Sequence, residues 1–156
     1  MAATTPDKMY QGILSRIKTA GDHSDFVHDD YIYISPTPRF TQEDDQFVQL
    51  VPGVPQSITS EAGYFLIEEE FEVVAWVRLF LDQGSRSTER YANSTYGILA
   101  VMSKVRSVLL NHIIDNSSDD AVLPITYVRG SRLFESDEYP GWGYLSDTYK
   151  FGYEIA

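Results

Sequence analysis

The chain has 156 residues, a length that fits one domain with its own hydrophobic core. It contains no cysteine, which excludes a disulfide scaffold, a thiolate zinc site and a cysteine nucleophile. With 23 acidic and 12 basic side chains, the formal charge is −11, so the surface is expected to repel nucleic acid. The sequence has neither a signal-peptide pattern nor an apolar run long enough to cross a membrane, so we expect a cytoplasm-made protein with no membrane partner.

The first predicted element is a helix over residues 6–20. Thr5 can cap its first turn, Pro6 suits the first helical position, and Gly21 can adopt the left-handed conformation that ends a helix. Apolar residues recur at helical spacing and form one stripe: Tyr10, Ile13, Leu14 and Ile17. Because Gly12 weakens the helix by about 1 kcal/mol relative to Ala, we expect packing of this stripe to hold it in place.

Two short strands are predicted next, over residues 31–35 and 47–51, from their β-branched and alternating apolar residues. The second lies inside a region, 36–63, that is otherwise dominated by Pro, Gly, Ser, Thr, Gln and acidic residues. Loops this long in a compact domain are usually functional or disordered. We therefore interpret 36–63 as a Pro-rich loop or arm inserted in the domain.

The strongest strand signal covers Tyr64–Leu81. One face of this segment is strictly apolar, while the other begins acidic and becomes aromatic. The apolar face holds Phe71, Val73, Ala75, Val77, Leu79 and Leu81. Such regular alternation fixes the register of a strand. Because the segment is longer than most strands, its acidic end is expected to project beyond the sheet as a β-arm with residues 63–67.

A long helix is predicted over residues 87–114, followed by strands over 121–129 and 148–155 with an aromatic-rich excursion at 131–147 between them. This order of elements predicts an α+β fold with a mainly antiparallel sheet of about four to five strands. The N-terminal helix and the long helix are expected on one face of the sheet, with a long β-hairpin arm and loops. We expect a single domain over residues 1–156.

The charge is unevenly distributed along the sequence. No Lys or Arg lies between Arg39 and Arg78, where the acidic residues are Glu43, Asp44, Asp45, Glu61, Glu68, Glu69, Glu70 and Glu72. The segment 84–111 has the opposite sign, with four basic residues against Glu89: Arg86, Arg90, Lys104 and Arg106. This segregation suits docking between copies of one chain. Its plain alternative is a surface kept soluble by acidic charge.

No catalytic, nucleotide-binding or metal-binding signature is found. Three histidines lack the spacing of a zinc motif: His23, His28 and His112. The acidic loop around the first two is interpreted as solvated, because its Asp spacing is not that of a calcium loop. Glu68, Glu70 and Glu72 share one face of the predicted strand, and we interpret them as an exposed or interfacial charge row rather than catalytic carboxylates. The sequence therefore predicts a protein that is not an enzyme and needs no cofactor.

The chain is rich in aromatic residues, with 11 Tyr, 8 Phe and 2 Trp. Several fall in segments that one small sheet is not expected to bury: Phe134, Tyr139, Trp142 and Tyr144. Aromatic residues dominate the hot spots of protein interfaces, so these residues are a candidate contact surface. The alternative, a satellite core beneath their own loop, is equally compatible with the sequence.

Four segments follow the predicted N-terminal helix: EEEFEVVAWVRLFLDQ, STERYANSTYGILAVMSKVRSVLLNH, PITYVRGSRLF and DTYKFGYEI. A long strand, a polar turn, a long helix and two closing strands in this order resemble the tail-terminator proteins of long-tailed bacteriophages, in the neck and tail-completion group. The resemblance covers nearly the whole chain as an arrangement of elements rather than as a motif. The insert 36–63 is longer than in a minimal member of that family.

The resemblance implies a structural protein of the virion tail or neck, made in the host cytoplasm. It implies a ring, typically of six copies, that caps the tail tube, meets the head-side connector and lets the genome DNA pass without specific binding. Candidate subunit-interface residues are Arg86, Arg90, Lys104, Arg106, Phe134 and Trp142. Candidate channel-facing acidic residues are Glu43, Asp44, Asp45, Glu68, Glu69 and Glu70, because carboxylates repel DNA phosphates.

Other functions remain open from the sequence alone. One alternative is a head-completion or connector adaptor protein of the neck, which would bind on the portal side. A second, from another class, is a small acidic hydrolase that uses the acidic cluster, or an acidic binding module. A stable ring favours the neck protein, whereas a monomer with a deep carboxylate-lined pocket favours the enzyme.

Overall fold

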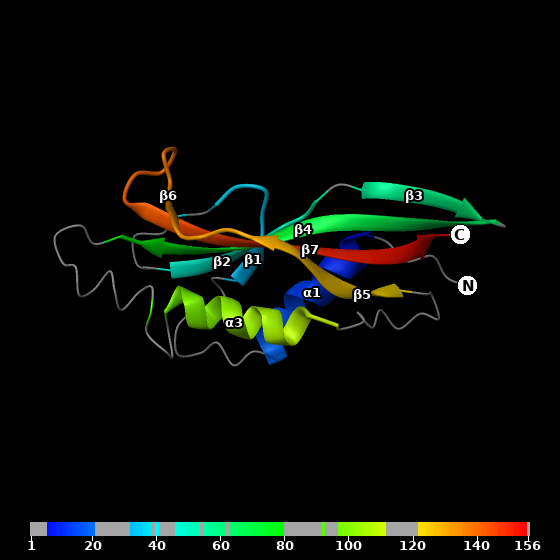
Figure 1. Cartoon of the computed structure of the whole chain (residues 1–156), viewed down its shortest axis with the longest axis horizontal. Helices are drawn as coiled ribbons and strands as arrows, with labels where there is room; N and C mark the ends of the chain where they lie inside the picture. The colour runs from blue at the N-terminus through cyan, green and yellow to red at the C-terminus, as the bar shows by residue number, and fades with distance from the viewer. Residues whose placement is uncertain are drawn as a thin grey trace.

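The computed structural model describes residues 6–20, 32–38, 40, 46–53, 55–61, 63–79, 92, 97–111 and 122–155. In this part of the chain, two helices and one mixed sheet of seven strands form the fold (Figure 1). The strands follow the order β1-β2-β4-β7-β5, with β3 paired to β4 and β6 paired to β7. Both helices lie on the same side of the sheet (Figure 1). The predicted α+β fold is confirmed, with more strands than predicted.

Helix α1 (Pro6–Ala20) confirms the helix predicted over residues 6–20. Its apolar stripe is buried in the main core: Met9, Tyr10, Ile13 and Ile17. Asp7 lies in its first turn and Lys18 in its last, where each charge is favoured by the helix dipole. The burial of this one face stabilises the helix and offsets the weakening by Gly12.

Strands β2 (Gln46–Val51) and β3 (Pro55–Glu61) lie end to end along one edge of β4 (Tyr64–Arg78). Together they make one long hairpin, and Gly63 in its turn has a φ of +94°, which favours glycine. The hairpin predicted at the acidic end of β4 is confirmed, but its projection beyond the sheet is wrong, because β7 pairs with β4 from Phe65 to Arg78. The strand predicted from Tyr64 is confirmed as far as Arg78, while 80–81 lie outside the described residues. Strand β3 was missed because its Ser, Thr and Gln residues give no apolar alternation.

Between β2 and β3 the hydrogen-bond ladder with β4 is interrupted. Pro52 has no N–H to donate, and Gly53 comes so close to β4 that a Cβ atom would lie 1.4 Å from the carbonyl oxygen of Glu70. The Gly53 N–H donates instead to the hydroxyl oxygen of Tyr10 at 3.0 Å. The break in the hairpin is therefore anchored on helix α1, and only glycine fits against β4 at this position.

The main core lies between the sheet and the two helices. The apolar alternation predicted for β4 is confirmed, because Phe71, Val73, Ala75 and Val77 are all buried on the helix side. Alternate residues of β7 (Trp142–Ile155) join them: Leu145, Tyr149, Phe151 and Tyr153. The opposite face of the sheet carries the charged and aromatic residues of the second alternation.

Helix α3 (Ile98–Leu109) is much shorter than the helix predicted over residues 87–114. Gly97 has an extended backbone with φ −68° and ψ 153°, so one continuous helix is wrong. At the other end Leu110 is extended, and the N–H of Asn111 donates to the carbonyl oxygen of Ile125 in the sheet at 2.9 Å. Apolar spacing alone could not reveal that the backbone leaves the helix at both points. Most of residues 87–96 and all of 112–114 lie outside the described residues.

The remaining strands partly follow the prediction. Strand β1 (Ile32–Ile34) pairs parallel with β2, and β5 (Val122–Gly130) agrees with the predicted 121–129. Two further observations correct the predicted excursion: β6 (Phe134–Glu135) pairs with β7, and β7 begins at Trp142 rather than at residue 148. The early part of β7 escaped prediction because a buried carboxylate, Asp147, sits where an apolar residue is expected.

Candidate assembly surface

An aromatic cluster covers part of the sheet face opposite the helices. Its buried members are Phe47, Val74, Trp76 and Trp142, and Tyr33, Phe40, Val51, Tyr139 and Tyr144 pack around them. The Trp76 Nε1–H donates to Gln49 Oε1 at 2.9 Å, which satisfies the indole group in this buried setting. The aromatic residues of the 131–147 segment therefore include a satellite core beneath their own hairpin, the second alternative that the sequence left open.

Two predicted interface residues lie at this cluster. Trp142 is 8% exposed, and the Arg78 guanidinium lies 5.0 Å from its ring centroid, so the ring is used inside the subunit. This corrects the prediction that Trp142 presents a contact surface. Phe134 is 40% exposed beside Arg132, and its role in a subunit contact stays a prediction.

A groove runs beside the aromatic cluster, between residues 36–38 and the β6–β7 hairpin. It has a volume of about 560 Å³. Its lining combines aromatic rings with four carboxylates, Glu72, Glu135, Asp137 and Glu138, and holds no Lys or Arg among the described residues. The groove therefore gives this face of the subunit a negative field with apolar walls, which suits a cationic partner surface.

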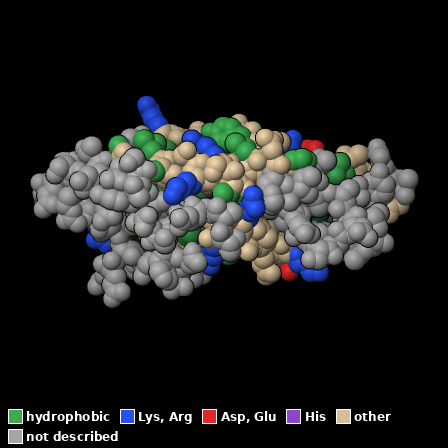
Figure 2. Space-filling model, turned by 90° about the horizontal axis from the view of Figure 1, so that it is seen from below, with side chains coloured by type: hydrophobic (Ala, Val, Ile, Leu, Met, Phe, Trp, Pro, Cys, Tyr) green, Lys and Arg blue, Asp and Glu red, His purple; other side chains and the backbone are tan. Residues whose placement is uncertain are grey.

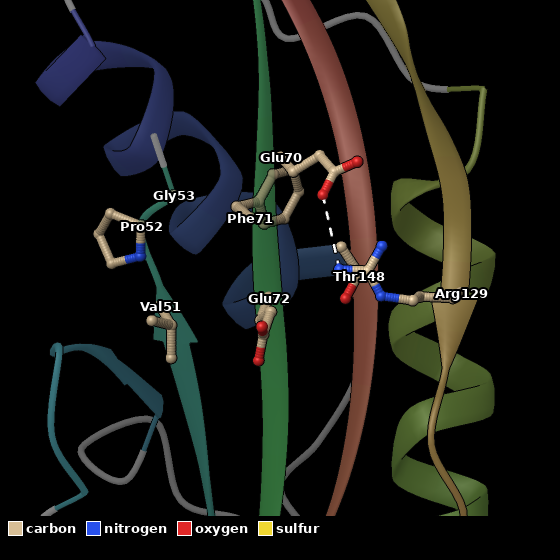
Figure 3. Close-up of a pocket in the computed structure, with 8 residues that line it drawn as sticks. All are labelled: Val51, Pro52, Gly53, Glu70, Phe71, Glu72, Arg129 and Thr148. Carbon is tan, nitrogen blue, oxygen red and sulfur yellow. Dashed lines mark ion pairs between the residues drawn. The ribbon is translucent and has the colours of Figure 1, made fainter. Parts of the chain in front are cut away.

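Farther along the same face, the predicted acidic row is partly neutralised. Glu68 Oε2 lies 3.1 Å from Lys150 Nζ, and Glu70 Oε2 lies 3.7 Å from an Arg129 nitrogen. Figure 3 shows the Arg129 side chain of β5 extending across β7 at Thr148 toward Glu70 of β4, beside a hollow of about 240 Å³. Because Glu68 and Glu70 are ion-paired within the subunit, they contribute less free negative charge than the sequence alone indicates.

Glu69 has a different place from its neighbours. Its side chain points to the helix side and is 3% exposed, so the prediction that it faces a channel is wrong. The hydroxyl groups of Tyr10 and Tyr153 donate to its two carboxylate oxygens. Burial, with the nearby Glu69 carboxylate, raises the pKa of Tyr153 to about 12 and raises the pKa of Tyr10 as well. This network joins α1, β4 and β7 at the base of the arm.

Arg106 is also used inside the subunit. Its Nε and Nη2 donate to Asp147 Oδ2 and Oδ1 at 2.7 and 2.8 Å, a bidentate pair that links α3 to β7. Asp147 is fully buried and also accepts a hydrogen bond from the Tyr149 hydroxyl at 3.1 Å. The hydrogen bonds to Asp147 raise the pKa of Arg106. The predicted contact of Arg106 with an acidic neighbour is thus corrected to an ion pair with the chain's own Asp147.

The helix side of the subunit has the opposite character from the groove. Figure 2 shows this side, where blue Lys and Arg side chains outnumber red acidic ones over the described surface. Lys104, a predicted interface residue, lies on α3 and is partly exposed. Five other predicted site residues lie outside the described residues: Arg86, Arg90, Glu43, Asp44 and Asp45.

Two kinds of feature are absent from the described residues. No group of three His, Asp or Glu side chains in this part of the chain is arranged to hold a metal ion. Among the same residues, no helix is long and apolar enough to span a membrane. Sequence reasoning missed Asp147, Tyr10 and Tyr153 as partners of charged groups, and no signal in one sequence identifies such long-range pairs.

Comparison with known proteins gives a fold relationship. No family model matches the chain, and no curated protein matches it. A protein chain of the virion of a native gene transfer agent particle aligns with a TM-score of 0.55 at 12% identity, covering 96% of this chain and 93% of that chain. A second solved structure, which carries no functional name, aligns with a TM-score of 0.56 at 14% identity, covering 96% of each chain. This chain therefore shares its fold, over nearly its full length, with both proteins.

Proposed function

We propose that this chain is a structural, non-catalytic virion protein that forms a ring on the end of the tail tube and joins the tube to the head-side connector. The observation that carries the proposal is the fold shared with a protein chain of a virion particle, over 96% of this chain and 93% of that one. An alignment that leaves so little of either chain unmatched supports the same kind of structural unit, rather than a fold fragment within a different one.

The charge of the two faces supports assembly into a ring of identical subunits. The groove carries carboxylates, and the two helices carry the basic residues Lys8, Arg16, Lys18 and Lys104. A negative groove on one face and a helix side where basic residues predominate among the described residues favour a head-to-tail contact between copies. Such a contact makes a closed ring when its rotation returns to the first subunit, and we expect six copies.

In this proposal the genome DNA passes through the ring without specific binding. The net charge of −11 keeps the phosphates from adhering to the lumen. Glu68 and Glu70 add less to this repulsion than unpaired carboxylates would, because both have cationic partners in the subunit. The tail tube protein and the head-side connector are the proposed partners.

Deletion of the gene in the virus or particle-producing strain tests the proposal. Without the ring, tail tubes should grow to irregular lengths and remain unattached to heads in electron micrographs. Filled heads beside free tails of normal length would instead indicate the head-side adaptor. Particles with normal, joined tails would contradict both neck functions, and the small hydrolase or binding module would then become the leading alternative.

A further inference from the structure

The outer edge of β3 differs from the other long edge of the sheet. Strand β3 pairs with β4 on one side, and no described residue pairs with its other side. At the opposite edge, β5 contains Pro124 and two register shifts against β7, and Asn111 covers the carbonyl oxygen of Ile125. Proline, bulges and covering segments are devices that keep an edge strand from pairing indiscriminately. In β5 the proline and the covering contact lie at residues 124–125, and the second bulge lies at Val128. The proline and register shift of β3 lie at its start, between Pro55 and Ser57, so residues 57–61 contain neither proline nor bulge, and no described residue covers their outer edge.

The register of β3 identifies which backbone groups the open edge presents. Residues 57–61 pair with 68–64 without interruption, and Glu61↔Tyr64 flanks the two-residue turn. The pair that closes such a turn is hydrogen-bonded, and hydrogen-bonded pairs alternate with non-hydrogen-bonded pairs along an antiparallel ladder. The N–H and C=O groups of Ile58 and Ser60 therefore point away from β4, toward the open edge.

Apolar side chains at this edge are also exposed. Ile58 of β3 is 61% exposed, and Phe65 of β4, which lies on the same face of the sheet, is 43% exposed. Strand β3 lies on the part of the hairpin that extends past the two helices (Figure 1), in keeping with the exposure of these two side chains. No Lys or Arg occurs in the hairpin before Arg78 to keep another strand away.

We propose that the open edge of β3 receives an edge strand from a second copy of this chain, so that a shared sheet links neighbouring subunits. This inference rests on the proposed ring assembly. Backbone hydrogen bonds to Ile58 and Ser60 supply the pairing, and the exposed Ile58 and Phe65 supply apolar contact. Strand addition between two different edges is a head-to-tail contact, the kind that closes into a ring.

The chain itself supplies a complementary segment. Residues 126–130 of β5 are all exposed, and they lie at the opposite edge of the sheet from β3. They present Tyr127 and Val128 for apolar contact. Arg129, whose side chain is 64% exposed, already pairs with Glu70 of its own subunit, so its charge is not counted toward the contact. The bulge at Val128 limits the pairing to a short ladder, which favours one register over continued stacking of sheets.

Two variants of one residue test the proposal. Ser60→Pro removes the outward N–H and places a ring against the incoming strand, while leaving the alternate residues that bond to β4 in place. Ser60→Ala keeps the N–H and serves as the matched control. We expect Ser60→Pro to raise the concentration for half-assembly at least about tenfold, and Ser60→Ala to leave it unchanged within about twofold. Ile58→Lys, which adds a charge to the exposed edge, should act like the proline.

The assembled state also gives a direct signature. In the wild-type assembly, the amide hydrogens of Ile58 and Ser60 should exchange slowly. In the monomeric Ser60→Pro variant, which has no amide hydrogen at position 60, that of Ile58 should exchange fast. The amide hydrogen of Thr59, which points to β4, should be protected in both proteins. The chain has no cysteine, so two introduced cysteines can report the β3–β5 contact. In a Ser60→Cys, Thr126→Cys double variant, disulfide bonds between β3 of one copy and β5 of the next should give a ladder of covalent oligomers on a non-reducing gel. Dimers from Ser60→Cys alone, without such a ladder from the double variant, would overturn the head-to-tail pairing.

The outcomes separate this inference from the proposed function. If the wild-type chain assembles, and Ser60→Pro and Ile58→Lys assemble equally well while folded by circular dichroism, the strand-addition proposal is wrong and the ring stands. If the wild-type chain stays monomeric at every concentration, both are wrong. Loss of assembly in both variants, with their circular dichroism and the Ser60→Ala control unchanged, supports the proposal.

Discussion

The two halves of the long β2–β3/β4 hairpin serve different purposes on either side of Gly53. Toward β2, the helices cover the sheet, and buried charge is paired, as in Arg106–Asp147. Toward β3, the same hairpin leaves the helices, and Ile58 and Phe65 are exposed. One continuous strand can therefore be part of the core at one end and exposed for contact at the other, because burial depends on what covers the sheet. The predictions below test this contrast between a self-sufficient body and a contact arm.

The largest effect is expected from the ion pair of the body, in which Asp147 is fully buried and the Arg106 side chain is 39% exposed. Arg106→Ala leaves the fully buried Asp147 carboxylate without its cation, which typically costs about 3–5 kcal/mol. Urea unfolding followed by circular dichroism measures the loss. Arg132→Ala is the matched control, because Arg132 stacks on exposed Phe134 and should change the free energy of unfolding by less than about 0.5 kcal/mol. Equal effects of the two variants would contradict a body held by the Arg106–Asp147 pair.

The junction between body and arm is the next target. Tyr10→Phe removes the hydroxyl that donates to Glu69 and accepts from the Gly53 N–H. Leaving these buried groups unsatisfied should cost about 1–3 kcal/mol in the free energy of unfolding. Tyr144→Phe, on the opposite face of the sheet, is the control. If both variants unfold at the same urea concentration as the wild type, the network does not anchor the arm.

Alkaline pH should weaken the same junction. The pKa of Tyr153 is raised from 10.0 to about 12 in the folded chain, so this phenol binds its proton more tightly when folded than when unfolded. Its stabilising contribution is complete below pH 10 and is lost as the pH rises through about 12. The urea midpoint of the wild type should fall over this range more steeply than that of Tyr153→Phe. Parallel curves for the two proteins would show that Tyr153 does not contribute.

The smallest effect on the subunit is expected at Ile58, whose cross-strand partner allows a matched comparison. Ile58 and Ile67 face each other across β3 and β4, but only Ile67 is buried. Ile67→Ala should cost about 2–5 kcal/mol, and Ile58→Ala less than about 0.5 kcal/mol. The order should reverse for assembly, where Ile58→Ala weakens association while the folded subunit persists. An Ile58→Ala variant as unstable as Ile67→Ala would mean that the arm belongs to the subunit core.

Local patterns predicted the parts of the fold that local energetics decide. The 6–20 helix has its own stop signal and apolar stripe, and the odd-numbered face of β4 alternates without a break. Strand β3 escaped because its pairing depends on β4 and not on its own residues. The helix predicted from residue 87 failed at Gly97, where an extended backbone interrupts a continuing apolar spacing.

The candidate site was less predictable, because a sequence does not show which way a charged side chain points or which residue it pairs with. Glu68, Glu69 and Glu70 look alike in a row, yet Glu69 alone turns into the core and meets Tyr10 and Tyr153. Arg106 could be assigned to a basic helix face but not to Asp147, which lies 41 residues away. Such pairs arise from the packing of α3 on β7, which periodicity does not encode.

The mass of the purified chain in solution tests the central claim most directly. Light scattering combined with native mass spectrometry should give a discrete assembly near six times the 17.7 kDa chain mass, seen as a closed ring by negative-stain electron microscopy. A stable 17.7 kDa monomer across the whole concentration range, or an open filament of indefinite length, would contradict a self-closing ring protein.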